Sequence, residues 1–210
     1  MALAVVHLDP QLLVVDKPAG LLTVPGRGAD KTDCLASRVL DLCSDALTVH
    51  RLDMATSGLV VFGRGKAAQR RLSMVFARRE VDKRYEAVVH GLVADDEGEI
   101  TLPLMADWPR RPMQKVDQDQ GKPSLTRWRV LERCPASAST RLALQPMTGR
   151  THQLRLHLAA IGHPILGDTL YSPPPIAAAA PRLLLHACML DLPAQASGSV
   201  ALRLSSTVPF

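Results

Sequence analysis

The sequence has few aromatic residues: two Trp, two Tyr and three Phe among 210 residues. Sheets that bind RNA by stacking its bases need several exposed aromatic rings, so this composition argues against such a platform. Cysteine is scarce as well, and no two cysteines form a CxxC pair. That spacing argues against a structural zinc site and against a secreted disulfide framework. We interpret Cys34, Cys43, Cys134 and Cys188 as buried free thiols.

Long apolar runs are also missing. No uncharged apolar segment approaches the roughly 20 residues of a membrane-spanning helix. The apolar segment 1–6 has no basic residues and is followed closely by Asp9, which does not fit a secretory signal peptide. Nor does the sequence contain a phosphate loop, a GxGxxG fingerprint or a nucleophilic serine elbow, so kinases, NAD enzymes and serine hydrolases are disfavoured. We expect a soluble, cytoplasmic protein.

The composition that remains is that of an ordinary globular protein, with 47% hydrophobic and 21% charged residues. A chain of 210 residues can bury a core without disulfides or metals. We therefore expect a single domain over 1–210. The formal net charge of +5 mildly favours an anionic partner.

Strands and helices alternate along the chain, but several strand pairs follow each other with no helix between them. Apolar runs predict strands at 12–15, 59–62, 85–89, 125–131 and 140–145. Helical spacing predicts three helices: one capped by Thr32 or Asp33, one after Gly65, and one that Thr151 caps and Gly162 ends. This pattern predicts an α+β fold with a mixed, mostly antiparallel sheet flanked by helices.

Two segments predict irregular structure. Residues 108–123 are rich in Pro, Gln, Asp, Lys and Gly, and we expect a long exposed loop or ribbon there. Residues 172–182 are rich in Pro and Ala, a composition typical of a mobile loop.

Asp53 is the first candidate for chemistry. It lies in a polar loop between Arg51 and the strand that begins near Leu59. An acid at the lip of a buried strand is partly desolvated and needs a nearby cation to stay ionised. The local pattern alone favours a turn aspartate that accepts hydrogen bonds from backbone amides.

A second cluster, Gly149 to His157, concentrates two Arg, two His and one Gln around the start of a helix. His152 and His157 are separated by about 140° around a helix, so we reject a shared metal site. Arg150 and Arg155 fit a solvated helix face, although Arg155 borders an apolar stripe.

The third candidate is a basic run. Residues 64–84 contain eight basic residues and two acidic ones, a net charge of +6. Such runs are usually solvated faces, but contact with a phosphate backbone is about as plausible here. Tyr85 follows this run, and taken alone it is more typical of a core or strand-surface residue than of a catalytic one.

Two long segments carry a family resemblance. The segments HRLDMATSG (His50 to Gly58) and GRTHQLRLHLAAIGHPILGD (Gly149 to Asp168) resemble the RluA-type pseudouridine synthases. The opening LLVVDKPAGLLTVPGR, then KRYEAVVHG and DWPRRPMQKVDQDQGKPSLTRW, resemble the same family. The likeness extends from about Val5 to about Tyr171. It implies a central RNA-binding cleft and leaves no room for the separate N-terminal RNA-binding domain that many members carry.

The resemblance implies that the protein isomerises uridine in RNA, with no metal and no organic cofactor. It implies Asp53 as the essential acid, Arg155 as the cation that pairs with that acid, and Tyr85 as the residue that stacks on the flipped uracil. Arg51 matches a residue that fills the gap left by the flipped base. The expected RNA-binding residues are Arg51, His50, Arg70, Arg71, Arg78, Lys83 and Arg150.

The expected partner is 23S ribosomal RNA, the anticodon stem-loop of transfer RNA, or both, bound by a monomer. One alternative is a catalytically silent RNA-binding or RNA-folding protein on the same scaffold. Another is a cofactor-free nucleosidase or glycosidase that uses Asp53. Glycoside hydrolases typically need two cooperating carboxylates, and we find no second candidate in either long segment.

Overall fold

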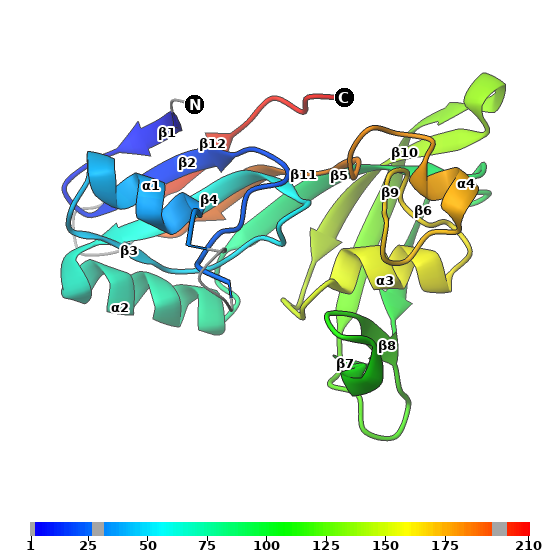
Figure 1. The fold of residues 1–210 in the computed structure, drawn as a ribbon, viewed down its shortest axis with the longest axis horizontal. Helices are drawn as coiled ribbons and strands as arrows, with labels where there is room; N and C mark the ends of the chain where they lie inside the picture. Colours follow the sequence, from blue (N-terminus) through cyan, green and yellow to red (C-terminus); the bar gives the residue numbers. More distant parts are fainter. Residues whose placement is uncertain (1–2, 27–31, 195–200) are drawn as a thin grey trace. The chain divides into compact units, whose positions relative to one another are not determined.

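A computed structural model describes residues 3–26, 32–194 and 201–210. The segment LLVVDKPAGLLTVPGR, which resembles the family, ends at Arg27, and that last residue lies outside the described ones. The chain forms two compact units (Figure 1). The first comprises Met1–Lys83 and His186–Pro209, and the second comprises Arg84–Leu185 and Phe210. That residues 1–210 act as one catalytic domain stays a prediction.

The first unit is built on a mixed sheet. Its strands are β1 (Ala4–Leu8), β2 (Leu12–Lys17), β3 (Ala46–Thr48), β4 (Ser57–Arg64), β11 (Leu185–Leu192) and β12 (Leu202–Ser205). The pairs β1–β2, β2–β4, β3–β4 and β11–β12 are antiparallel, and β4 pairs with β11 in parallel. The predicted mixed, mostly antiparallel sheet is confirmed.

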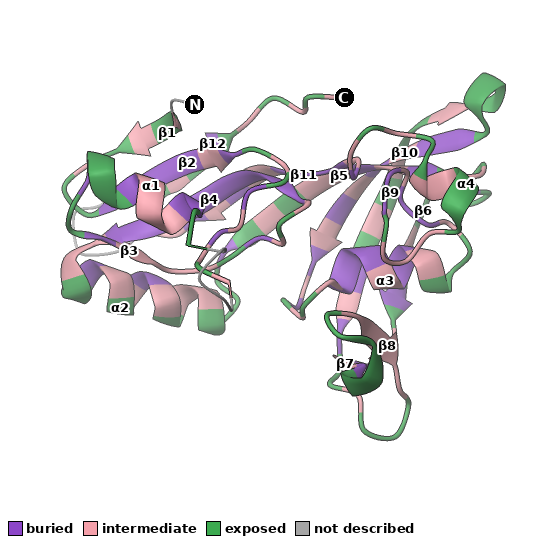
Figure 2. Cartoon of the chain, viewed as in Figure 1, coloured by how far each residue is buried: buried purple, intermediate pink, exposed green. Residues whose placement is uncertain are grey.

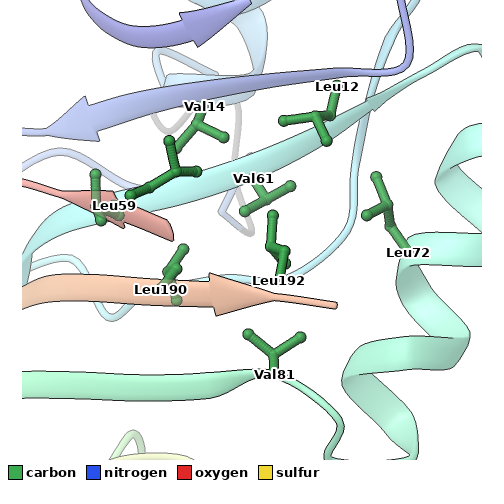
Figure 3. Packing of buried hydrophobic residues seen from close by; sticks show 9 residues of the cluster. Leu12, Val14, Leu59, Val61, Leu72, Val81, Leu190 and Leu192 are labelled. Carbon is green, nitrogen blue, oxygen red and sulfur yellow. The ribbon is translucent and has the colours of Figure 1, made fainter. Parts of the chain in front are cut away.

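The core of this unit lies where β2, β4 and β11 meet α2. Leucines and valines from these four elements pack together, as Figure 3 shows: Leu12, Val14, Leu59, Val61, Leu72, Leu190 and Leu192. Residues 12–15 are all buried, and β4 is buried over its first seven residues (Figure 2). Both faces of these strands are therefore covered, which explains their continuous apolar runs.

Among the described residues of the first unit, the α-helices are α1 (Leu35–Leu42) and α2 (Gly65–Ala77). The predicted cap of α1 at Thr32 or Asp33 is wrong. Cys34 is the N-cap, since its Sγ accepts from the Ser37 backbone N–H and the Ser37 hydroxyl accepts from the Cys34 N–H. Asp33 instead forms an ion pair with Arg38.

The second unit contains an antiparallel sheet in the order β5 (Asp82–His90), β10 (Ser139–Pro146), β9 (Leu125–Cys134) and β6 (Glu97–Thr101). A two-stranded ribbon, β7 (Leu104–Ala106) with β8 (Gln114–Val116), carries the 3-10 turn Trp108–Arg110 at its end. The exposed ribbon predicted for 108–123 is thus partly ordered as a hairpin. With these helices and strands the fold class is α+β, as predicted.

Helix α3 (Gln153–Ala160) packs on this second sheet. Thr151 does not cap it: the N-cap is His152, which has a φ of +54° and makes no side-chain capping bond. The predicted end at Gly162 is confirmed, because Gly162 has a φ of +85° and its N–H donates to the Ala159 carbonyl. Within 172–182 the residues Pro174–Ala177 form the short helix α4, while the mobility of this loop stays a prediction.

All four cysteines are free thiols. Cys34 and Cys43 are buried as predicted, whereas Cys134 and Cys188 are only partly buried. No helix in the described part of the chain is long and apolar enough to cross a membrane.

Candidate active site

Asp53 lies in the loop that connects β3 to β4, in the first unit. Its side chain is partly buried, and its carbonyl accepts a hydrogen bond from the Thr56 N–H at 3.1 Å, which closes a turn. Arg51, two residues earlier, is exposed, while Leu52 between them is buried. The loop therefore presents Asp53 and Arg51 from a backbone that is anchored by its apolar neighbour.

Polar groups clamp the backbone on both sides of Asp53. The Thr23 hydroxyl donates to the Leu52 carbonyl at 2.8 Å and accepts from the Leu52 N–H at 3.2 Å. On the other side, the Met54 carbonyl accepts from the Gly20 N–H at 2.8 Å. Because both neighbours of Asp53 are tied to the segment 20–23, the loop cannot shift without breaking buried hydrogen bonds.

Lys17 completes this clamp. Its side chain is fully buried, and its ammonium donates to the carbonyls of Leu21 at 2.8 Å, Pro18 at 2.9 Å and Met54 at 3.2 Å. A buried ammonium is costly unless all its donors are satisfied, and three carbonyl dipoles satisfy them here. Neither Lys17 nor Thr23 was predicted as a site residue from the sequence. The available signal was a lysine directly after a buried apolar strand.

His50 holds the loop to the sheet rather than projecting as a cation. Its Nε2 accepts the Val61 N–H at 3.1 Å, and its ring stacks on Phe76 with centroids 4.4 Å apart. Burial, and then the positive charge of Lys83, lower the pKa of His50 from 6.5 to about 3. The imidazole is therefore neutral at physiological pH and cannot bind phosphate through charge. A contact of His50 with RNA stays a prediction.

The basic run does not form one face of α2. Arg70 is exposed on the helix, whereas Arg71 is partly buried and its Nη2 donates to Gln11 Oε1 at 2.9 Å. The helix ends at Ala77, so Arg78 and the following Arg79 lie beyond it. Cations at this end of a helix are favoured by the helix dipole. Arg70 and Arg78 are both exposed, as are Lys66, Arg79 and Arg84 of the same run.

Lys83, at the end of the same run, is partly buried. Burial lowers the pKa of its ammonium, and the positive charge of Arg79 lowers it further. An anion close to Lys83 would relieve this repulsion. Contacts of these basic residues with RNA stay predictions.

Tyr85 lies on β5 in the second unit. It stands directly opposite Leu144 of β10, and Leu144 stands opposite Trp128 of β9. Residues directly opposite in antiparallel strands share one face of the sheet, so Tyr85 lies on the face that also carries Thr126. Helix α3 covers that face, because its Gln153 Nε2 donates to Thr126 Oγ1 at 3.0 Å.

Arg155 is buried, so its interpretation as a solvated helix residue is wrong. It is 3% exposed, and its Nε and Nη2 donate to the two carboxylate oxygens of Asp168 at 2.7 and 2.6 Å. Asp168 is 1% exposed and also accepts from the N–H groups of Leu170 and Tyr171. This fork fixes the plane of the guanidinium. Asp168 ends the second long segment, so our statement that neither segment offers a second carboxylate is also wrong.

Tyr171 links this ion pair to the β7–β8 ribbon. Its ring lies 5.3 Å from the Arg155 guanidinium, and its hydroxyl is 2.7 Å from His152 Nδ1. The same hydroxyl accepts from the Gln114 N–H of β8 at 2.8 Å. Neither this link nor the partner of Arg155 could be read from the sequence, because the contacts join segments distant along the chain.

Arg150 is partly buried at the entrance to α3, where its Nε donates to the Pro123 carbonyl at 3.4 Å. His157 is fully buried; burial lowers its pKa, and a hydrogen bond to the Leu102 carbonyl opposes this shift. In the parts of the chain that the structure covers, no three His, Cys, Asp or Glu side chains are grouped to hold a metal ion.

The end of the β7–β8 ribbon carries an exposed ring that the sequence analysis did not select. Trp108 is 64% exposed, and the Arg111 guanidinium lies 3.5 Å from its ring centroid. Arg110 beside them pairs with Asp107. A large exposed aromatic ring next to two cations is typical of surfaces that bind nucleic acid. The run of Trp, Pro and Arg was the available signal.

The first unit thus offers an anchored carboxylate and exposed cations, and the second offers an oriented guanidinium and a tyrosine. Comparisons with known proteins agree. The family model for RNA pseudouridylate synthases matches residues 11–160. The chain is 49% identical to the dual-specificity RNA pseudouridine synthase RluA of Pasteurella multocida (strain Pm70), over 88% of this chain and 84% of that protein.

Other relatives give the same result. The protein of that name from Escherichia coli (strain K12) is 48% identical over 94% of this chain and 90% of its own length. The solved structure of Human RNA Pseudouridylate Synthase Domain Containing 1 matches with a TM-score of 0.82 at 29% identity, covering 100% of this chain and 84% of that one. The chain belongs to the RNA pseudouridylate synthase family.

Proposed function

We propose that the protein converts specific uridines in structured RNA to pseudouridine and that Asp53 is its essential carboxylate. In this isomerisation the N1–C1′ bond breaks, the uracil turns, and C5 forms a new bond to C1′. The proton leaves C5 and N1 gains one, so the base keeps its composition and no co-reactant is consumed. The observation that supports Asp53 most directly is the double clamp on Leu52 and Met54, which preorganises the acid between them.

Three other residues have roles in the proposal. Arg155 pairs with the reacting carboxylate and keeps it ionised, with its guanidinium already oriented by Asp168. Tyr85 stacks on the flipped uracil and assists removal of the C5 proton. Arg51, which is exposed, enters the gap that the flipped base leaves in the RNA. The pairing of Arg155 with Asp53 is part of this proposal.

The substrate class follows from the relatives. Proteins at 48–50% identity are named dual-specificity RNA pseudouridine synthases, so we propose that this protein also acts on more than one RNA. The RNAs we propose are a short loop of 23S ribosomal RNA and the anticodon stem-loop of transfer RNA. A monomer in the cytoplasm, with no metal, completes the proposal.

The proposal is tested by tritium release from RNA that carries [5-³H]uridine, under single-turnover conditions. We expect release by the wild type and none by Asp53→Asn, which keeps the shape of the side chain and removes its charge. The control is Asp41→Asn, the same change at an exposed position of α1, and it should leave release unchanged. Turnover by Asp53→Asn at the wild-type rate would remove Asp53 from the mechanism.

The same RNA products separate the alternatives. A silent RNA-binding protein would bind the RNA and release no tritium from it. A nucleosidase or glycosidase would liberate free uracil, which chromatography detects. Asp168 is the second carboxylate that such a hydrolase would need, but its oxygens are occupied by Arg155 and by two backbone N–H groups.

A further inference from the structure

A buried histidine joins four strands of the first unit near the Asp53 loop. His186, which is 1% exposed, lies on β11, and its Nδ1 is 2.8 Å from the hydroxyl of Ser57, the first residue of β4. Its Nε2 is 2.9 Å from the hydroxyl of Ser206, just after β12. Ser206 in turn donates to the carboxylate of Asp16 on β2. The four side chains form one continuous chain of hydrogen bonds.

The direction of these bonds follows from the carboxylate at one end. A carboxylate accepts only, so the Ser206 hydroxyl donates to Asp16, and a lone pair of Ser206 Oγ accepts from His186 Nε2–H. A neutral imidazole that carries its proton on Nε2 has a lone pair on Nδ1. With the imidazole neutral, the Ser57 hydroxyl therefore donates to His186 Nδ1. Each member of the chain orients the next one.

This series of hydrogen bonds ends at Ser57, where the Asp53 loop runs into β4. Ser57 is four residues after Asp53, and Thr56, directly before it, closes the turn on the Asp53 carbonyl. Strands β4 and β11 run parallel and pair at two positions only, Ser57 with His186 and Gly58 with Ala187. A pairing of two residues supplies few backbone bonds, so the side-chain bond between Ser57 and His186 adds a substantial part of the constraint.

At Gly58, directly after Ser57, the backbones of β4 and β11 are in close contact. Gly58 has a φ of +117°, and a Cβ there would lie 2.3 Å from the Ala187 carbonyl oxygen. The backbones of β4 and β11 therefore approach each other as closely as glycine allows. A change in the position of His186 would be transmitted directly to the last residues of the loop.

We propose that His186 is a positioning residue for isomerisation: held by Ser206 and Asp16, it fixes Ser57 and so the exit of the Asp53 loop. The proposal rests on the proposed function, since it assigns to Asp53 the reacting carboxylate. Lys17 and Thr23 hold the two neighbours of Asp53, and the chain through His186 holds the strand into which the loop runs. A displacement of about 1 Å at a reacting group can cost on the order of 100-fold in rate.

The test uses the full-length chain and two variants that each remove one hydroxyl, Ser57→Ala and Ser206→Ala. For each we would measure the single-turnover rate constant at saturating enzyme, the affinity for an RNA hairpin, and the urea midpoint of unfolding. The control is Leu192→Val, which trims a buried core residue at the far end of β11. It lowers stability without touching the chain of hydrogen bonds.

We expect the rate constant to fall about tenfold or more in Ser57→Ala and measurably in Ser206→Ala, with RNA affinity within about twofold of wild type. Leu192→Val should keep the wild-type rate constant. Wild-type rate constants in both serine variants would overturn the proposal. The hydrogen bonds through His186 would then only stabilise the sheet. A loss confined to Ser57→Ala would overturn the role of His186 and Ser206.

A parallel measurement of Asp53→Asn separates this proposal from the proposed function. If Asp53→Asn is inactive while both serine variants react normally, only the positioning role fails. If Asp53→Asn reacts like the wild type, the proposed role of Asp53 fails, whatever the serine variants do.

Discussion

Replacement of Arg155 by Met is expected to destabilise the protein strongly, because it leaves Asp168 charged and buried without its partner. Both side chains are almost completely buried, at 4% and 1% exposure, and two bonds of 2.6–2.7 Å join them. Breaking a buried pair by removing one partner costs about 3–5 kcal/mol. Asp168 keeps two backbone N–H donors, so we expect about 3 kcal/mol, the lower end.

The assay is thermal unfolding followed by far-UV circular dichroism. For a chain of this length about 3 kcal/mol corresponds to a fall in Tm of ~6–12 °C. The control is Arg127→Met in the same unit, where Arg127 Nε also lies 2.7 Å from a carboxylate, that of Glu99, but both side chains are about half exposed. That exposed pair is worth about 1 kcal/mol at most, so its Tm should change by less than ~4 °C.

A double variant sharpens the result. Arg155→Met with Asp168→Asn removes the buried charge and keeps an oxygen for the two backbone N–H groups, so it should regain part of the lost stability. Equal Tm changes in Arg155→Met and Arg127→Met would refute the argument that burial makes the Asp168 pair important. A further loss of stability in the double variant would refute the argument that the unpaired charge causes the damage.

Three further predictions concern other parts of the chain. Replacing Arg70 and Arg78 with Gln should weaken RNA binding and flatten the plot of log affinity against log salt by ~0.7–0.9 per lost phosphate contact, whereas an unchanged slope would mean that these residues only face solvent. Because burial lowers the pKa of His50 to about 3 in the folded protein, against 6.5 ordinarily, its contribution to stability is complete above pH 6.5 and is lost as the pH falls toward 3. In urea unfolding at several pH values, the free energy of unfolding of His50→Asn should depend less steeply on pH than that of the wild type. An identical pH dependence in the two proteins would contradict this assignment. Lys17→Met should cost about 2–3 kcal/mol in urea unfolding, since it removes the ammonium donor from the carbonyls of Pro18, Leu21 and Met54, while Lys66→Met at an exposed position of α2 should cost under ~0.5 kcal/mol; equal costs would argue against the clamp.

The strands could be predicted from the sequence because burial leaves a local signal. The run 12–15 is apolar at every position, and it becomes β2, which is covered on both faces. The same holds for β4, whose apolar residues 59–62 are all buried and pair with β2. Such runs need no knowledge of their partners.

The helix starts were predicted less well, since several residues near each start could serve as caps. Thr32, Asp33 and Thr151 are favoured cap residues by type, yet Cys34 caps α1 and His152 precedes α3 in a left-handed conformation. A free thiol rarely takes this position. The backbone conformation of His152 is set by the loop before it, where the Gln153 side chain accepts the Arg150 N–H.

The contacts that shape the candidate site could not be predicted, because they join distant segments. Arg155 looked like a border residue of a helix, and only the fold brings Asp168 to it. Lys17 looked like the end of a strand, and only the fold shows its ammonium on the Met54 carbonyl, 37 residues away. The family resemblance predicts Asp53 as the reacting acid, but it does not predict the groups that hold its loop.

The most direct test of the central claim is to map pseudouridines in the RNA of cells that lack this protein. The account predicts that defined uridines in 23S ribosomal RNA and in transfer RNA stay unmodified, and that the wild-type protein restores them while Asp53→Asn does not. An unchanged set of pseudouridines in those cells, or full restoration by Asp53→Asn, would contradict it.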